Sequence, residues 1–259
     1  MERDLIGLVA GFVLAAVTTP VGVSGAVFLL PLQLSVLHVP SPRVTPTNLL
    51  YNVISGPGSL LRYRRSGLVD GTLARQLVAG SVPGVVLGAV LRVYVVTDPD
   101  VFRLLAAAVL APTGLLILRR PRTAATQHRM SGRLSGRTVT GLAFAVGVVG
   151  GLYGIGGGSV VGPILVGAGM AVATVAPAAL FATWVTSIVG VATYAVISLD
   201  ATGPVAPDWS LGLACGLGGL AGGWVGASLQ PRIPERVLRS LLGVLALLLA
   251  AGYVAAVAS

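Results

Sequence analysis

The length of the charge-free apolar runs is the feature that most constrains this chain. Cutting the 259-residue sequence at every Asp, Glu and Arg leaves runs at 5–42, 44–61, 76–91, 104–118, 138–199, 209–231 and 240–259. A helix needs about 20 apolar residues to cross the roughly 30 Å hydrocarbon core of a bilayer, and flanking arginines can reach back to its surface. The first and fifth runs are long enough for two or three segments each. The pattern predicts an all-α integral membrane protein.

Composition and charge agree with this prediction. Hydrophobic residues make up 55% of the chain and charged residues 10%, whereas a soluble domain carries roughly 25% charged residues. The formal net charge is +9, and every basic residue is an arginine. Loops rich in arginine stay on the cytoplasmic side of a membrane, so the excess indicates topology and not binding of nucleic acid. The largest cluster lies between two apolar blocks and predicts a basic cytoplasmic loop over 119–137: Arg119, Arg120, Arg122, Arg129, Arg133 and Arg137.

The two halves of the chain contain the same signals in the same order. The sequence Gly22-Val-Ser-Gly25 recurs 132 residues later as Gly154-Ile-Gly-Gly157. A second block recurs at an offset of 131, as Pro46, Leu49, Asn52, Ser55 and Tyr63 followed by Pro177, Leu180, Thr183, Thr186 and Tyr194. A third block matches Gly80, Gly84 and Gly88 with Gly218, Gly222 and Gly226. Such internal similarity predicts two homologous transmembrane repeats, 1–118 and 138–259, on either side of the basic loop.

The relative orientation of the repeats depends on their first two segments, which flank glycine breaks at 22–25 and 154–158. If the two segments form a hairpin, the repeats are inverted, and thirteen arginines share the cytoplasmic side with four opposite. If they form one interrupted crossing, the repeats are parallel and the division becomes eleven against six. Both arrangements remain open, and the distribution of arginine favours inverted repeats.

The second glycine break is the strongest local signal. Glycine occupies four of the five positions 154–158, and Ser159 follows. Glycine adopts backbone conformations closed to other residues, so the run predicts an interrupted helix whose amide groups are buried in protein or line an aqueous cavity. A helix that begins at Ser159 would direct the positive end of its dipole into that cavity, which suits an anion. The alternative is that the glycines serve only close helix packing, which is the interpretation we adopt for the Gly80 and Gly218 blocks.

Polar residues within the apolar segments indicate where an anion would bind. Asn48, Asn52 and Ser55 share one helical face. Thr183, Thr186 and Ser187 occupy the corresponding face in the second half. Amides and hydroxyls can donate hydrogen bonds to a small oxyanion without a buried arginine. No catalytic residue, metal ligand or cofactor is expected. The candidate substrate-binding residues are Gly154, Gly156, Gly157, Gly158, Ser159, Gly22, Ser24, Gly25, Asn52, Thr183 and Thr186.

Taken together, these residues resemble the TauE/SafE family of sulfite and sulfonate exporters. The resemblance rests on Gly-x-Gly-Gly-Gly-Ser-x-x-x-Pro at 154–163, its weaker copy from Gly22 to Pro31, and the stretch from Asn48 to Asn52. It implies a multi-pass transporter in the cytoplasmic membrane that exports a small sulfur-containing anion and has no cofactor. Import of a small anion, or a role as a non-transporting membrane assembly protein, are the alternatives. The oligomeric state stays open.

An enzyme is a further alternative that the residues disfavour. Gly22-Val-Ser-Gly25 also fits the Gly-x-Ser-Gly string around the nucleophile of rhomboid proteases. A serine nucleophile needs a histidine within hydrogen-bond reach, and the chain has only His38, near the end of a segment, and His128, in the basic loop.

The acidic residues bear on the driving force. All eight lie at the ends of apolar runs or in loops, so no carboxylate is placed to relay protons in mid-membrane. We therefore expect an anion to be driven outward by the inside-negative membrane potential.

Overall fold

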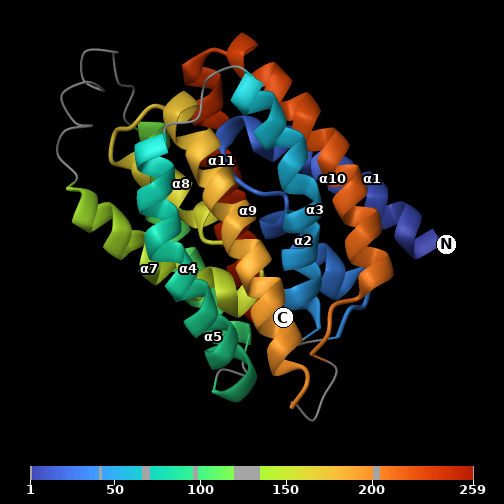
Figure 1. Cartoon of the computed structure of the whole chain (residues 1–259). Coiled ribbons are helices and arrows are strands. Elements are labelled where there is room, and N and C mark those ends of the chain that lie inside the picture. Colours follow the sequence, from blue (N-terminus) through green and yellow to red (C-terminus); the bar gives the residue numbers. More distant parts are fainter. Residues whose placement is uncertain are drawn as a thin grey trace.

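The computed structural model describes residues 2–40, 43–65, 71–95, 99–119, 135–200 and 205–258, and these residues are helical apart from turns and short connections. Six of the described helices are long and apolar enough to cross a membrane, which confirms the prediction of a helical membrane protein. They are α1 (Glu2–Thr18, extended by the 3₁₀ turn Thr19–Val21), α4 (Gly71–Tyr94), α7 (Gly136–Tyr153), α9 (Val172–Ile197), α10 (Trp209–Leu229, extended by Gln230–Arg232) and α11 (Glu235–Ala258) (Figure 1). Most of the predicted basic loop, 120–134, lies outside the described residues.

Four further helices complete the described chain: α2 (Ala26–Ser35), α3 (Val44–Arg65), α5 (Pro99–Arg119) and α8 (Gly158–Gly167). With ten residues each, α2 and α8 are about 15 Å long, which is half the hydrocarbon thickness. The long helix α3 carries polar side chains on its buried face, among them Thr47, Asn48 and Asn52. The short helices and α3 therefore bring polar groups and helix ends to the middle of the protein.

Helices α1, α3 and α10 run in the same direction and begin at one end of the protein. Along the α1–α10 contact, Gly7 lies beside Cys215, and Gly222 lies beside Phe12 farther along both helices. The contact between α3 and α10 follows the same order, with Gly212 beside Leu50 and Gly223 beside Ser59. We call this end, where Asp208 precedes α10, the Asp208 end.

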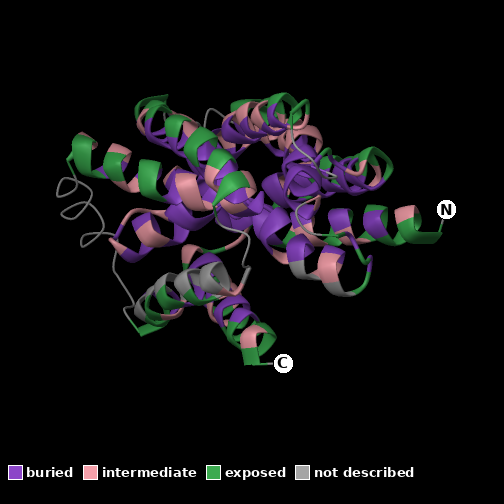
Figure 2. Cartoon of the chain, turned by 90° about the horizontal axis from the view of Figure 1, so that it is seen from below, coloured by how far each residue is buried: buried purple, intermediate pink, exposed green. Residues whose placement is uncertain are grey.

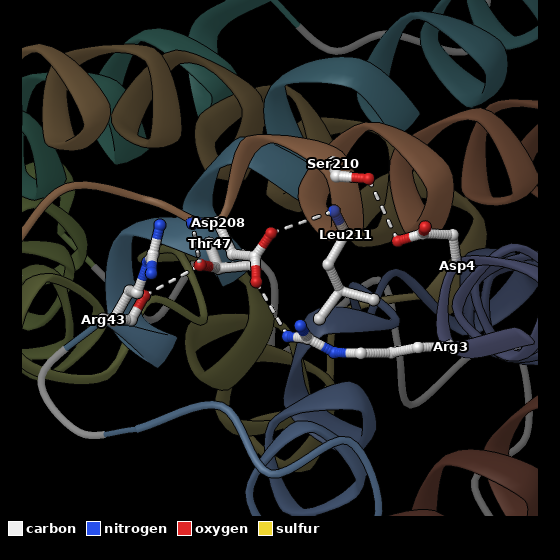
Figure 3. Close-up of polar contacts among 7 residues, drawn as sticks. All are labelled: Arg3, Asp4, Arg43, Thr47, Asp208, Ser210 and Leu211. Carbon is white, nitrogen blue, oxygen red and sulfur yellow. Dashed lines mark hydrogen bonds and ion pairs between the residues drawn. The ribbon is translucent and has the colours of Figure 1, made fainter. Parts of the chain in front are cut away.

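A network of polar contacts joins the three helix starts at the Asp208 end (Figure 3). Arg3 donates from Nη2 to Asp208 Oδ2 at 2.7 Å, and the other carboxylate oxygen accepts from the backbone N–H of Leu211 at 3.2 Å. The backbone N–H of Asp208 donates to Thr47 Oγ1 at 2.8 Å. Ser210 Oγ donates to Asp4 Oδ1 at 3.1 Å. Asp208 thus caps α10 and ties α1 and α3 to it.

Helices α3 and α10 finish at the opposite end, which we call the Arg65 end. The guanidinium of Arg65 stacks over the Trp224 ring, 5.2 Å from its centroid. Helices α9 and α11 begin here, since Glu235 Oε1 accepts from the backbone N–H of Val172 at 3.1 Å. Because α1 runs toward the Arg65 end and α3 starts again at the Asp208 end, the chain turns back at the first break. Segments α1 and α2 therefore form a hairpin.

The second half turns back in the same way. Helix α7 runs parallel to α4, with Gly136 beside Gln76 and Gly151 beside Val85. Helix α4 runs from the Arg65 end toward the Asp208 end, where its residue Ala89 packs in a cluster with Leu49 of α3. Since α7 therefore starts at the Arg65 end, and α9 starts there as well, α7 and α8 also form a hairpin.

Two glycine-lined contacts hold the long helices together. On α4, a Cβ added to Gly80 or Gly84 would overlap the backbone of α7, and on α10 a Cβ added to Gly218 or Gly222 would overlap the backbone of α1. The α4–α7 and α1–α10 pairs lie side by side in Figure 1. Small residues let membrane helices approach closely enough for backbone contact. The packing interpretation of these glycines is confirmed.

The distribution of buried and exposed residues agrees with this arrangement of helices. Figure 2 shows buried residues gathered in the middle of the protein and exposed residues on the outward faces of the long helices, while α5 and α11 pack together at one edge. The outward faces carry large apolar side chains such as Leu5, Val9 and Val13 of α1. That pattern is typical of a protein whose outer surface contacts lipid.

We predict that Gly222→Ala lowers the thermal stability of the detergent-solubilised protein. The added methyl overlaps the carbonyl of Phe12, and overpacking costs about 1–3 kcal/mol. Gly252→Ala in α11 is the matched control, because no atom of the described residues lies within 4 Å of its added Cβ. Size-exclusion chromatography after a temperature series measures both variants, and an equal loss in the two would contradict the close contact.

A second prediction concerns Asp208. Asp208→Asn keeps an oxygen for the N–H of Leu211 and loses the ion pair to Arg3, so it should cost less than about 1 kcal/mol. Asp208→Ala loses the helix cap as well and should cost about 1 kcal/mol more. The same thermal assay checks the order, and equal melting temperatures for the two variants would argue against capping.

Candidate functional site

The first break changes the direction of the chain between α1 and α2. Gly22 adopts φ +77°, in the left-handed region, and ends the 3₁₀ turn that follows α1. Ser24 follows, and its hydroxyl accepts from the backbone N–H of Ala26 at 3.1 Å and donates to Oδ1 of Asn52. Gly25 precedes the first residue of α2. The serine therefore stabilises the start of α2 and links it to α3.

The second break contains two glycines in the left-handed region. Gly154 ends α7 at φ +73°, and Gly156 has φ +72°. Both conformations are strained for other residues, which explains the glycines at these positions. The backbone N–H of Gly157 donates to Thr186 Oγ1 at 3.4 Å, and Ser159 Oγ donates to the carbonyl of Ile155 at 2.9 Å. The predicted interruption of the helix is present, and the Gly157 amide and the Ser159 hydroxyl bond within the protein.

The two breaks meet in the middle of the protein. The backbone N–H of Ser24 donates to Ser159 Oγ at 3.3 Å, which joins the first break to α8. Asn48 of α3 lies between the breaks, where its Nδ2 donates to the carbonyl of Ala26 at 2.8 Å and its Cβ is close to Gly154. Hydrogen bonds and close packing therefore connect the two breaks through α3 and α8.

A small cavity of about 20 Å³ lies beside the first break. This volume holds about one water molecule. Four of the predicted binding residues line it: Ser24 and Gly25 from the break, Asn52 from α3 and Thr183 from α9. The other lining residues are Ala15, Thr19, Tyr51, Ser55, Gly56, Ser59, Leu180, Trp184, Gly219 and Gly223. An anion larger than water can enter only when the walls separate.

Three of the lining side chains, those of Tyr51, Asn52 and Thr183, carry hydrogen-bond donors that have no partner among the described residues. Asn52 is 2% exposed and Thr183 is 3% exposed, and neither Nδ2 of Asn52 nor Oγ1 of Thr183 makes a hydrogen bond within that part of the chain. Because the Ser24 hydroxyl occupies Oδ1 of Asn52, the amide NH₂ is the free end of that side chain. A buried donor without a partner costs about 1–3 kcal/mol. The amide of Asn52 and the hydroxyl of Thr183 therefore offer donors to a group that accepts hydrogen bonds.

The helix ends favour a negative charge at the same place. Gly25 lines the cavity and immediately precedes α2, so the positive end of that helix dipole points toward the cavity. The start of α8 lies behind Thr183, whose Oγ1 is 2.6 Å from the position a Cβ on Gly158 would take. None of the described residues that line the cavity is charged. The site can bind a small oxyanion through neutral donors and helix ends.

The other predicted binding residues do not line the cavity. A Cβ on Gly158 would overlap the backbone of Ala179, and one on Gly157 would lie 2.6 Å from Ser81 Oγ. The second break is thus closely packed, and the open space lies beside the first. The residues that lie outside the cavity lining are Gly22, Gly154, Gly156, Gly157, Gly158, Ser159 and Thr186.

Sequence reasoning missed part of the lining. Tyr51 and Trp184 contribute aromatic side chains, and Gly219 and Gly223 of α10 close one wall. Each aromatic residue is adjacent in the chain to a predicted polar residue, and in the sequence alone it merges with the apolar background. The helix face that contains Asn52 and Ser55 also contains Ser59, at the same spacing of three to four residues. A prediction that followed this spacing one turn farther would have included Ser59.

The geometry offers no support for a serine nucleophile or a metal centre in the described part of the chain. The hydroxyl of Ser24 donates to Asn52, and His38 lies in the connection between α2 and α3, while His128 is outside the described residues. Over the described ranges, no three residues among His, Cys, Asp and Glu come together as metal ligands would.

Comparison with known proteins gives one match. The family model described as sulfite exporter TauE/SafE matches residues 5–253, which is nearly the whole chain. No curated protein and no solved structure matches it. The resemblance seen in the glycine motif and the Asn48–Asn52 stretch is therefore confirmed, and this chain belongs to the sulfite exporter TauE/SafE family of membrane transporters.

Proposed function

We propose that this protein binds a small sulfur-containing oxyanion in the cavity beside the first break and exports it across the cytoplasmic membrane. The observation that carries the proposal is the pair of buried donors of Asn52 and Thr183, unpartnered among the described residues, on one cavity beside the start of α2. An oxyanion offers acceptors to both donors and a charge to the helix dipole. The remaining predicted residues of both breaks hold the cavity walls in position.

The chemistry of these donors suits transport. A transported ion must bind well enough to enter and weakly enough to leave. An amide, hydroxyls and a helix end supply a moderate attraction, whereas a buried arginine would have to be paired and would hold the anion firmly. The neutral character of the described lining residues is consistent with release on the far side.

Two inverted repeats are part of the proposal. Tyr63 Oη donates to the carbonyl of Thr19 at 3.1 Å, and Tyr194 Oη donates to the carbonyl of Gly151 at 2.8 Å. The two tyrosines are 131 positions apart in the sequence and the two carbonyls are 132 positions apart, which are the offsets of the repeated sequence blocks. The glycine contacts correspond in the same manner. A Cβ on Gly80 would overlap the carbonyl of Thr140, and a Cβ on Gly218 would overlap the carbonyl of Leu8. Since the first half starts at the Asp208 end and the second at the Arg65 end, the proposed repeats, 1–118 and 138–259, have opposite orientations.

The distribution of arginine supports a cytoplasmic Arg65 end. Within the described part of the chain, nine arginines lie at that end and four belong to the Asp208 end. Positive residues remain on the cytoplasmic side during insertion. The nine are Arg62, Arg64, Arg65, Arg75, Arg119, Arg137, Arg232, Arg236 and Arg239, and the four are Arg3, Arg43, Arg92 and Arg103.

We predict that Thr183→Val weakens sulfite efflux from loaded proteoliposomes. Valine keeps the shape of threonine and removes the hydroxyl, and a hydrogen bond to a charged group contributes about 1.5–3 kcal/mol, so the half-saturating concentration should rise about tenfold to a hundredfold. Asn52→Leu should act in the same direction.

Ser187→Ala is the matched control for Thr183→Val. Ser187 lies one helical turn farther along α9, and its buried hydroxyl also has no partner among the described residues, but it does not line the cavity. Its loss should leave efflux unchanged. If Thr183→Val transports like the unmodified protein, or if both variants lose activity to the same extent, the cavity is not the binding site.

We also predict that the membrane potential alone drives the flux. Every acidic residue that the structure describes lies at a helix end or in a connection: Glu2, Asp4, Asp100, Asp200, Asp208 and Glu235. An inside-negative potential of 100 mV is worth about 2.3 kcal/mol for each charge, roughly a fiftyfold concentration ratio.

A potassium gradient with valinomycin sets the potential in proteoliposomes with equal pH on both sides. Sulfite efflux should accelerate as the inside becomes more negative. A requirement for a proton gradient at zero potential would contradict uniport, and net uptake under the same gradients would reverse the proposed direction.

A further inference from the structure

A second hollow lies between α3 and α9 on the side of the Arg65 end. It has a volume of about 430 Å³, far larger than the cavity beside the first break. Its walls are apolar apart from Arg64, which belongs to the last turn of α3. The lining residues are Pro57, Leu60, Leu61, Arg64, Phe181 and Trp184. We call this hollow the α3–α9 groove.

Trp184 lines both the groove and the polar cavity. Its indole packs against α3 at Gly56, where an added Cβ would overlap the ring. Val53 precedes Arg65 by twelve positions in α3, so the indole lies about 18 Å from the Arg65 end. The groove thus reaches from the arginine-rich end to the indole, and the cavity begins on the other side of it.

A specific hydrogen bond holds the indole in this position. Pro57 lies inside α3 and has no N–H, so the carbonyl of Val53, four residues earlier, lacks its usual helical partner. Trp184 Nε1 donates to that carbonyl at 3.0 Å. The proline therefore creates an acceptor on α3 that the tryptophan of α9 occupies.

We propose that Trp184 is a gate between the α3–α9 groove and the anion-binding cavity, and that the Val53 carbonyl exposed by Pro57 is its latch. The inference rests on the proposed function for the identity of the ligand that passes. Arg64 attracts an anion into the groove, and the indole must leave Val53 before the anion reaches Asn52 and Thr183. Opening breaks one hydrogen bond and leaves the α3 backbone otherwise intact.

The test measures access to the cavity without transport. A thiol is introduced by Ser55→Cys in a Cys215→Ala background, because Ser55 lines the cavity and Cys215 is the chain's only cysteine. Membrane vesicles with the Arg65 end outward are treated with the membrane-impermeant anion 2-sulfonatoethyl methanethiosulfonate. The labelling rate is compared among gate variants.

Trp184→Phe retains a ring and loses the N–H, so the closed state loses one hydrogen bond. The population of the open state, and with it the labelling rate, should rise about fivefold. Trp184→Ala removes the barrier and should raise the rate by at least about tenfold. Pro57→Ala restores an N–H for the Val53 carbonyl, and should match Trp184→Phe. Because both variants break the same latch, combining them should add nothing further.

A thiol introduced by Ser81→Cys is the control position. Ser81 is buried beside the second break and lines neither hollow, so its labelling should not respond to changes at Trp184. Unchanged labelling of the Ser55→Cys thiol in both Trp184 variants would overturn the gate. Labelling as expected in a protein that fails to move sulfite would refute the proposed function and leave the gate supported.

Discussion

The need to satisfy every backbone polar group away from water governs this structure. In hydrocarbon an unpaired N–H or carbonyl is costly, so an interrupted helix is tolerated only inside protein or beside an aqueous space. Here both interruptions lie in the centre, enclosed by α3, α4 and α9. The long helices at the outside pack through glycines and present apolar faces outward. The short helices α2 and α8 can then begin in mid-protein, because neighbouring hydroxyls satisfy amides just ahead of each helix. Ser159 accepts from the N–H of Ser24, before α2, and Thr186 accepts from the N–H of Gly157, before α8.

Enclosure of the breaks also determines the chemistry of the cavity. Ser24 links the start of α2 to Asn52, and that bond directs the amide NH₂ away from the serine. Thr183 contributes a second donor from α9. In the proposed mechanism the anion supplies these two groups with acceptors. The space accommodates about one water, so in the proposed mechanism the cavity must widen before it can hold an anion.

The sequence was sufficient to predict the helical membrane fold class and the position of the breaks. Both depend on local properties of the chain, namely the length of an apolar run and a cluster of glycines. The sequence also pointed to Asn52 and Thr183 as cavity residues, since a polar side chain within a membrane segment is costly unless it faces protein or water. It gave more weight to the second break than to the first. The richer glycine run, 154–158, is closely packed, whereas the cavity lies beside Ser24 and Gly25. That difference depends on which side chains from distant helices fill each site. Trp184 could not be identified for the same reason, because its position depends on Pro57 in another helix.

The glycine contacts have a consequence for how the chain is made. Helix α1 packs against α10, and α4 packs against α7, so each contact joins an early helix to a late one. During synthesis the N-terminal portion enters the bilayer well before its counterparts leave the ribosome. Its small-residue faces must therefore remain covered by lipid or by the insertion machinery until the C-terminal portion arrives. Assembly of the native protein is in this sense a late event, because α1 has to wait for α10 and α5 has to wait for α11.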